Sequence, residues 1–216
     1  MNQQEYIFGI EKTLINAKDL FEDAEILFKK NRFSRAYTLY QLSIEEIGKA
    51  TLIFNFLLHK DIFDIDEQKK IIREFINHKS KTKSSIGLDV LLAFVISDQK
   101  LKEKVIYQIR KQEKEIEQLN ILKNRSLYTD IIEEKFINPK EIITEKLAKD
   151  IKFIAQIRLN IANGFFKFAI TNFEQLYKAF KKIDEQEMIN NPPPEIIYLA
   201  NLKIEEIINY ELKQQV

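Results

Sequence analysis

The stretch Ala36–Leu58, AYTLYQLSIEEIGKATLIFNFLL, decides the fold, and its only charged residues are Glu45, Glu46 and Lys49. At about 100° per residue, Glu45 and Lys49 share a helical stripe with aliphatic and aromatic side chains, while tyrosines and isoleucines fill the opposite side. No face of such a helix is polar, and a helix that is apolar all round is normally buried. The stretch therefore predicts a central, buried helix.

Burying two carboxylates and an ammonium group is costly unless the charges are paired or serve a site. One interpretation is an internal pair between Glu45 and Lys49, with Glu46 reaching solvent. The other is a functional site. Gly48 favours the second, because a glycine inside a helix costs about 1 kcal/mol relative to alanine. Its expected use is the close approach of another backbone, a partner helix or a ligand.

Composition sets the fold class. The chain has 216 residues, 45% of them hydrophobic, but only four glycines and four prolines. That is too few for the turns of a β-sandwich or barrel, so we predict an all-α bundle of long antiparallel helices with short connections. We expect one helical domain over residues 1–191, followed by a proline-rich spacer and a C-terminal helix over 192–216.

Composition also excludes several function classes. The absence of cysteine excludes a disulfide scaffold, a thiolate metal site and a cysteine nucleophile. The net charge of +1 provides no global attraction for nucleic acid, so any such binding depends on a local basic patch. With no signal peptide and no uncharged apolar run of about 18 residues, we expect a soluble, cytoplasmic protein without membrane contact.

Periodicity and capping residues place the other helices. We expect Ser34 to cap the central helix, which should form an antiparallel hairpin with the preceding helix. Residues 126–138 break the helical pattern. The segment Glu141–Ile183 reads as one long helix or two stacked ones. Predicted helices are Gln3–Lys30, a short helix that starts at Asp64 or Asp66 and runs into His78, Ser84–Val95, Ser97–Lys123 and Glu195–Gln214, the last after Pro192–Pro194.

A second polar spot surrounds His78, at the expected junction between two helices and beside Lys79, Lys81 and Lys83. Histidine is the side chain best suited to move protons near neutral pH, and lysines stabilise phosphoryl transition states. The alternative is a surface or capping histidine without chemistry.

A third spot is Lys123–Asp130, KNRSLYTD, on an expected loop. Tyr128 and Asp130, next to Arg125, can orient a histidine or hold a ribose phosphate. The alternative is an ordinary turn with a tyrosine packed on the body.

These three spots, in this order, resemble the AbiV family of abortive-infection proteins in the HEPN superfamily of helical bundles. EEIGKA at Glu45–Ala50 is the strongest part, followed by His78-x-x-Lys81 and by LYTD at Leu127–Asp130, where the family pattern has LYVD. The resemblance spans roughly residues 12–180. It implies a HEPN-like, dimeric all-α protein that acts against phage by disabling RNA. The site residues it implies are Glu45, Glu46, Lys49, His78, Lys81, Tyr128 and Asp130.

The usual HEPN ribonuclease motif is an arginine, four to six residues and a histidine. Arg73 and His78 have this spacing, but Glu74 stands where a polar residue such as Asn or Asp is usual. Residues five apart on a helix point about 140° from each other. Both can reach one substrate only if the helix bends or ends between them, or if a dimer mate supplies one.

The resulting hypothesis is a metal-independent endoribonuclease without a cofactor. His78 acts as general base or acid, Lys49 and Lys81 stabilise the phosphate, and Glu45 or Glu46 orients Lys49. Tyr128 and Asp130 complete the pocket. Lys79, Lys83, Arg125 and Arg73 are the expected RNA-binding residues. No metal is expected, because the carboxylate and histidine residues needed for a metal set are too few.

Two other function classes remain open. The chain could be a non-catalytic HEPN module that binds a nucleotide or senses a phage protein, or a structural helical partner whose buried charges set dimer register. The expected partners are a second copy of the chain, RNA, and a phage-encoded activator or an antitoxin. We predict a homodimer because apolar residues on every side of the central helix exceed what one small bundle covers.

Overall fold

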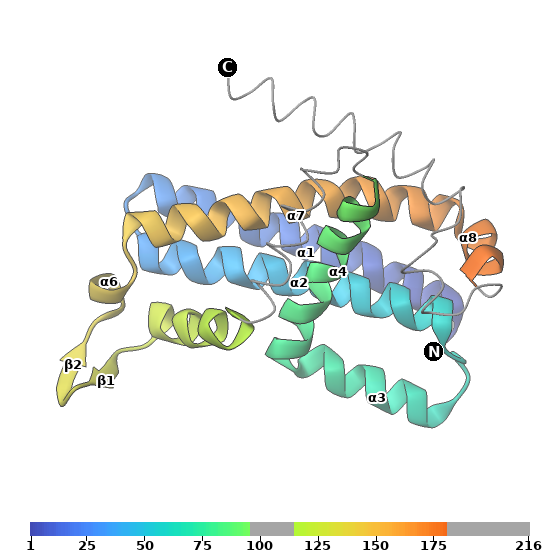
Figure 1. Cartoon of the computed structure of the whole chain (residues 1–216), viewed down its shortest axis with the longest axis horizontal. Helices are drawn as coiled ribbons and strands as arrows, with labels where there is room; N and C mark the ends of the chain where they lie inside the picture. Colours follow the sequence, from blue (N-terminus) through green and yellow to red (C-terminus); the bar gives the residue numbers. More distant parts are fainter. Residues whose placement is uncertain (96–114, 181–216) are drawn as a thin grey trace, which may run out of the picture.

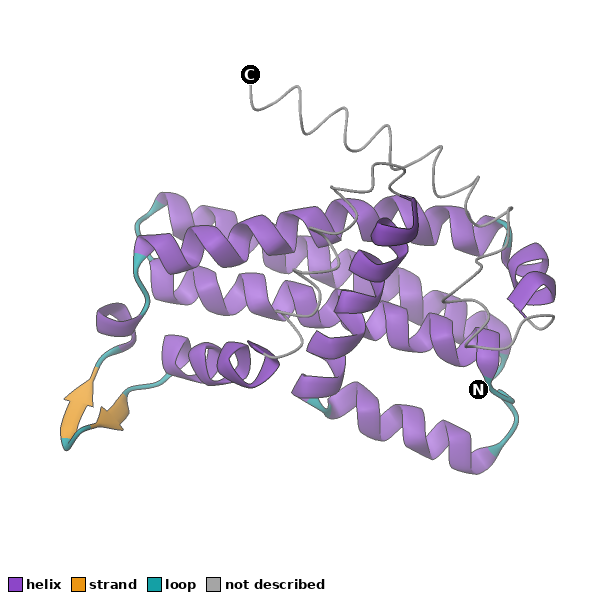
Figure 2. Ribbon diagram, viewed as in Figure 1, coloured by secondary structure: helices purple, strands orange, loops and turns teal. Residues whose placement is uncertain are grey.

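The structure, a computed structural model, describes residues 1–95 and 115–180. The predicted spacer at Pro192–Pro194, the predicted helix Glu195–Gln214 and the domain boundary after residue 191 lie outside the described residues. Within them, helices dominate and the only strands form one small hairpin, so the predicted all-α class is confirmed (Figures 1 and 2).

The first two helices, α1 (Gln3–Lys29) and α2 (Phe33–His59), form the predicted antiparallel hairpin (Figure 1). Asn31 makes the tight connection with φ 57, in the left-handed region that asparagine tolerates better than most residues. The predicted cap at Ser34 is wrong. The helix α2 begins at Phe33, and Arg32 occupies the N-cap position without a side-chain hydrogen bond.

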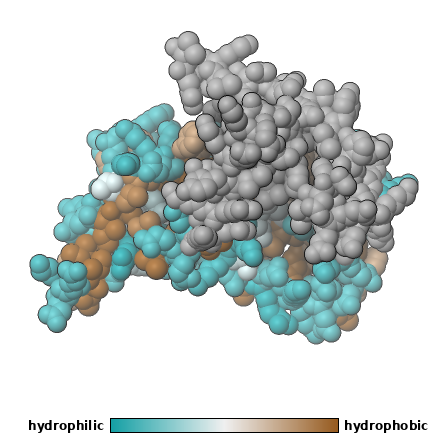
Figure 3. Space-filling view, in the orientation of Figure 1, coloured by the Kyte–Doolittle hydropathy of each residue, from teal (hydrophilic) through white to brown (hydrophobic). Residues whose placement is uncertain are grey.

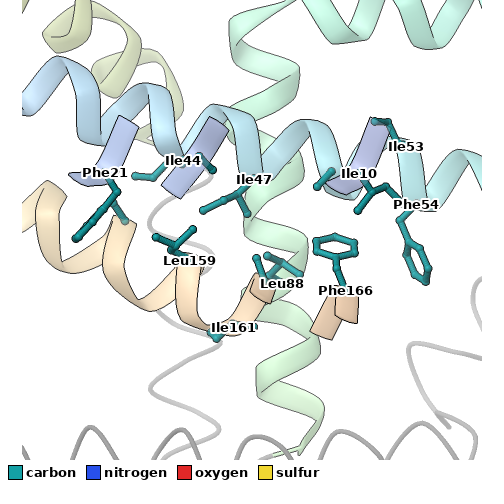
Figure 4. Packing of buried hydrophobic residues seen from close by; sticks show 14 of the residues in the cluster. Ile10, Phe21, Ile44, Ile47, Ile53, Phe54, Leu88, Leu159, Ile161 and Phe166 are labelled. Carbon is teal, nitrogen blue, oxygen red and sulfur yellow. The ribbon is translucent and has the colours of Figure 1, made fainter. Parts of the chain in front are cut away.

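The third long helix, α7 (Glu145–Thr171), packs against α1 and α2. Apolar side chains of α1, α2, α4 and α7 fill the space between these helices, including Phe21, Ile47, Leu159 and Phe166 (Figure 4). The helix α2 is buried on nearly all sides, as its composition predicted. Glu45, Glu46 and Lys49 consequently lie inside the protein or at its helix contacts.

Two further helices follow α2. Asp64 caps α3 (Ile65–Ile76) by accepting hydrogen bonds from the backbone N–H groups of Asp66 and Glu67, as one of the two predicted caps. The next helix, α4 (His78–Val95), crosses α2 and α7 steeply (Figure 1).

The prediction that α4 starts at Ser84 is wrong by six residues. The side chain of Asn77 accepts hydrogen bonds from the backbone N–H groups of Lys79 and Ser80, which is the geometry of an N-cap. The same residue ends α3. His78 therefore lies at a helix junction, as expected, but as the first residue of α4.

Residues 115–127 are helical and lead into a hairpin of strands β1 (Asp130–Ile132) and β2 (Lys135–Ile137) (Figure 2). Glu133 and Glu134 form its two-residue turn, both with positive φ. A short helix, α6 (Pro139–Ile142), separates the hairpin from α7.

Of the two alternatives for residues 141–183, one long helix is wrong: after the end of α6, which contains Glu141, the described residues form two helices, α7 and α8 (Phe173–Phe180). A single residue, Asn172, separates the end of α7 at Thr171 from the start of α8. Residues 181–183 lie outside the described part of the chain.

Candidate functional site

Glu45 is the centre of a cluster of charged side chains from three helices. Its side chain is only 2% exposed, and its Oε1 accepts a hydrogen bond of 2.6 Å from Lys123 Nζ. Its Oε2 lies 2.6 Å from His78 Nδ1 and 3.1 Å from Lys81 Nζ. We call Glu45, His78, Lys81 and Lys123 the Glu45 cluster.

Gly48 explains how α4 reaches Glu45. A Cβ atom at Gly48 would lie 1.8 Å from the carbonyl oxygen of Lys81, a distance that no packed side chain could have. The missing side chain lets the first turn of α4 lie against α2, one turn from Glu45. The prediction that Gly48 serves the close approach of another backbone is confirmed.

The helix of residues 115–127 brings Lys123 to Glu45. Its end is held on α2 by two contacts of polar groups: the hydroxyls of Thr38 and Ser126 lie 2.7 Å apart, and Arg35 Nη1 donates to the carbonyl of Leu127 at 2.9 Å. Lys123 is not among the site residues that the sequence predicts. No local pattern could have found it, because Glu45 lies 78 positions away.

The cluster carries more positive than negative charge. Burial alone raises the pKa of Glu45, but the hydrogen bonds from Lys123 and His78 and the charges of Lys123 and Lys81 outweigh that effect and lower the pKa below its ordinary value. Glu45 is therefore ionised at neutral pH. One carboxylate then faces two ammonium groups, each on a side chain only 7% exposed.

His78 is the accessible member of this cluster. Its side chain is 54% exposed, whereas the carboxylate it contacts is buried. With Nδ1 directed at Glu45, the opposite ring nitrogen, Nε2, is the atom free to exchange protons with a ligand. This arrangement of a buried carboxylate that orients a half-exposed imidazole is typical of catalytic and metal-ligating histidines.

Comparison with known proteins identifies the family. The AbiV family model, which describes a HEPN domain, matches residues 5–160 and so covers the whole Glu45 cluster. The chain belongs to the AbiV family. Membership implies a role in abortive-infection defence, and the resemblance inferred from the sequence is confirmed. Neither a curated protein nor a solved structure matches the chain.

Glu46 and Lys49 on α2 of this AbiV-family protein form a separate pair. Lys49 Nζ lies 2.5 Å from Glu46 Oε1 and 4.8 Å from the centre of the Phe75 ring. The interpretation that paired Lys49 with Glu45 is wrong, because a shift of one residue places Glu46, rather than Glu45, on the side of α2 that Lys49 reaches. Both partners are mostly buried.

Tyr128 and Asp130 lie apart from the cluster in their contacts. The side chain of Tyr128 is exposed, and Asp130 Oδ2 pairs with Arg125 Nε at 2.9 Å. Within residues 1–95 and 115–180, no hydrogen bond or ion pair joins either residue to Glu45, His78 or Lys81. Their predicted role in completing the pocket stays a prediction.

The predicted RNA-binding residues are on the surface. Arg73 is exposed on α3, which ends at Ile76, so the helix end needed between Arg73 and His78 is present. No hydrogen bond between these two occurs in the described part of the chain. Lys79 pairs with Glu117 at 2.5 Å, and Lys83 is exposed.

No group of three histidine, cysteine, aspartate or glutamate side chains among the described residues could hold a metal ion. The expectations of no metal and no cofactor stay predictions. None of the helices that the structure describes is both long enough and apolar enough to span a bilayer.

Proposed function

We propose that the protein is a metal-independent endoribonuclease that disables RNA during phage infection, with His78 as its general base. The contact of 2.6 Å between His78 Nδ1 and Glu45 Oε2 carries this proposal. A buried carboxylate fixes the proton on Nδ1 and leaves Nε2 as the proton acceptor, which is the geometry that general base catalysis requires.

The reaction follows from this geometry. Nε2 of His78 takes the proton of a ribose 2′-OH, and the 2′ oxygen attacks the adjacent phosphorus. The bond from phosphorus to the 5′ oxygen breaks, and the leaving 5′ oxygen takes a proton from water, so the products are a 2′,3′-cyclic phosphate and a 5′-hydroxyl. The surplus positive charge of Lys81 and Lys123 stabilises the negative charge that grows on the phosphate oxygens.

The remaining residues have supporting roles. Glu45 is a positioning residue, since it acts through His78 and is itself buried. The pair of Lys49 with Glu46 adds no net charge and holds α2 against Phe75 of α3. Arg73, Lys79, Lys83 and Arg125 are proposed to attract the RNA backbone from the surface.

Cleavage of end-labelled RNA by the purified protein, with and without EDTA, tests the proposal. We expect cleavage in both conditions, and fragments that end in a 2′,3′-cyclic phosphate. His78→Ala removes the base and is expected to abolish cleavage. Lys69→Met, which removes an exposed lysine of α3 paired with Asp66, serves as the matched control and should cleave normally. Folded wild-type protein that leaves RNA intact, both alone and with extract of phage-infected cells, would overturn the proposal.

A binding module is the second candidate. Lys81 and Lys123 are buried, and their ammonium groups both contact Glu45. This observation favours a binding module, because the two lysines can provide positive charge without contacting a reacting atom. In that case the positive charge of the Glu45 cluster would bind RNA or a nucleotide, but the RNA would not be cut. A structural role alone would leave neither binding nor cleavage.

We also propose that the protein acts as a homodimer. Ile65, Ile72 and Ile76 recur on the outward face of α3 and are exposed, while Ile71 on the opposite face is buried. A second copy on this stripe would cover it close to His78, which follows Ile76 by two positions. Light scattering should give twice the 25.7 kDa of one chain, and a mass near that of one chain would refute the dimer.

A phage-encoded activator or an antitoxin is the remaining proposed partner. Capture of the tagged full-length chain from infected and uninfected cells should recover such a protein. A partner that binds only during infection is the expected activator, whereas one that binds before infection and suppresses cleavage is the expected antitoxin.

A further inference from the structure

Tyr128 is an exposed aromatic side chain for which the catalytic geometry has no use. It is 64% exposed, although its backbone N–H still donates to the carbonyl of Asn124 at 3.0 Å in the last turn of the helix. The ring is thus carried on an ordered backbone rather than on a free loop. An ordered, solvent-facing tyrosine ring is a surface on which a planar ligand can stack.

Arg35 contacts the backbone next to Tyr128. Its Nη1 donates to the carbonyl of Leu127, the residue before Tyr128, at 2.9 Å. Arg35 itself is exposed. One donor therefore anchors the guanidinium. No carboxylate pairs with Arg35 among the described residues, so its charge and its other N–H groups face solvent. Arg125, in contrast, is paired with Asp130.

From this juxtaposition we propose that Tyr128 and Arg35 form a binding subsite for one unpaired nucleotide of an RNA strand. The base stacks on the Tyr128 ring, and Arg35 binds the adjacent phosphate. This inference rests on the proposed function, because it assigns the cleaved RNA a second contact outside the Glu45 cluster. It implies that the preferred substrate is single-stranded, since a paired base cannot stack on a side chain.

The position of the subsite relative to the cluster fits this role. Tyr128 follows Lys123 by five positions and lies one residue beyond the helix of residues 115–127. Lys123 faces inward to Glu45 and Tyr128 faces solvent. Tyr128 is therefore placed to hold a neighbouring nucleotide and not to exchange protons at the cleaved bond.

The subsite ends before the tip of the hairpin. Glu133 and Glu134 form that tip, and their charges repel a phosphate backbone. Ile131 and Phe136, directly paired across the strands, are exposed and contribute to the hydrophobic surface over the hairpin (Figure 3). Phe136 thus provides an exposed aromatic ring without a neighbouring free arginine, which makes it a suitable control.

The test uses the full chain with His78→Ala in every protein, so that RNA is bound without being cut. A single-stranded RNA that carries one 2-aminopurine reports stacking by fluorescence quenching, and its anisotropy reports affinity. We expect Tyr128→Leu to weaken binding by about 5- to 100-fold and to abolish the quenching. Tyr128→Phe should retain both, and Phe136→Leu should bind normally. Tyr128 is exposed, so these variants should fold.

The outcomes separate this inference from the proposed function. If RNA is cleaved by the wild type and Tyr128→Leu binds and quenches normally, the subsite is refuted and the nuclease stands. If Tyr128→Leu and Phe136→Leu weaken binding equally, exposed aromatic rings bind RNA nonspecifically and the subsite is refuted. If Tyr128→Leu instead lowers the mass in light scattering, this face contacts protein, which also refutes it. Absence of any RNA binding or cleavage by the wild type overturns both.

Discussion

Two carboxylates, the buried Glu45 and the partly buried Glu25, are held in different ways. Glu25 on α1 accepts hydrogen bonds from the hydroxyl of Tyr40 on α2 and from Lys152 on α7 at 2.8 Å. We call these three residues the Glu25 network. It joins the three long helices, just as the Glu45 cluster joins α2, α4 and the helix of residues 115–127.

The difference is in charge. In the Glu25 network one carboxylate contacts one ammonium group and a neutral phenol, and Lys29 adds only the smallest coulombic effect. Burial is the largest effect that raises the pKa of Tyr40, so the phenol stays protonated. In the Glu45 cluster one carboxylate faces two ammonium groups and a half-exposed imidazole. A balanced network is sufficient for stability, whereas surplus positive charge beside an accessible base favours an anionic ligand.

Glu45→Gln should have the largest effect. It leaves Lys81 and Lys123 buried without a counter-charge, so we expect unfolding free energy to fall by about 3–5 kcal/mol in urea titrations, together with loss of activity. Glu25→Gln is the matched control. Lys152 is partly exposed and can turn to water, so the loss there should be about 1–2 kcal/mol. Equal losses would remove the distinction between the two carboxylates.

His78→Ala should separate activity from stability. Loss of a general base lowers the rate by about 10²- to 10⁴-fold, which single-turnover cleavage of labelled RNA would measure. Since the side chain is half exposed, the free energy of unfolding should change by less than about 1 kcal/mol. A variant that is fully active would show that the contact with Glu45 is only structural.

Gly48→Ala should disrupt the Glu45 cluster by displacing the backbone of α4. The added Cβ would meet the Lys81 carbonyl oxygen at 1.8 Å, so α4 must shift, at a cost of about 1–3 kcal/mol and with reduced activity. Gly87→Ala on α4 is the control, because its Cβ would lie 3.5 Å from Thr51 Cγ2, an ordinary contact. That variant should gain about 0.4–1 kcal/mol in thermal or urea unfolding. A stabilised Gly48→Ala protein would contradict the close approach.

The smallest effect should be on how the free energy of unfolding falls at acid pH. The pKa of Glu45 and that of Glu25 are both lowered on folding, despite burial, by their hydrogen bonds and cationic neighbours. The unfolded chain then binds more protons, so these stabilising contributions are complete above about pH 4.3 and decline as pH falls through the folded values. Urea unfolding at pH 3–7 should show that the free energy of unfolding falls less steeply with decreasing pH in Glu45→Gln than in the wild type. An unchanged steepness would mean that Glu45 is not ionised in the fold.

Local periodicity was enough to locate the long helices α1, α2 and α7, because hydrophobic spacing reports which face of a segment is buried without reference to its partner. The predicted starts of α2 at Ser34 and of α4 at Ser84 were wrong, because several residues near each start could serve as the N-cap. Of these, Asn77 accepts hydrogen bonds from the first backbone N–H groups of α4, whereas the N-cap of α2 makes no side-chain hydrogen bond. The short hairpin also escaped prediction, since three-residue strands carry too little alternation to detect.

The sequence by itself determined the all-α fold, the buried α2, the family and the use of Gly48, because each can be inferred from composition, local periodicity or short motifs without knowing which side chains meet. Only the tertiary structure decided which charges meet. The choice of Glu46 rather than Glu45 for Lys49, and of Lys123 for Glu45, depends on how helices cross and dock. Coulomb attraction acts between whichever groups packing brings within a few ångströms, and spacing along the chain carries no information about partners 78 positions apart.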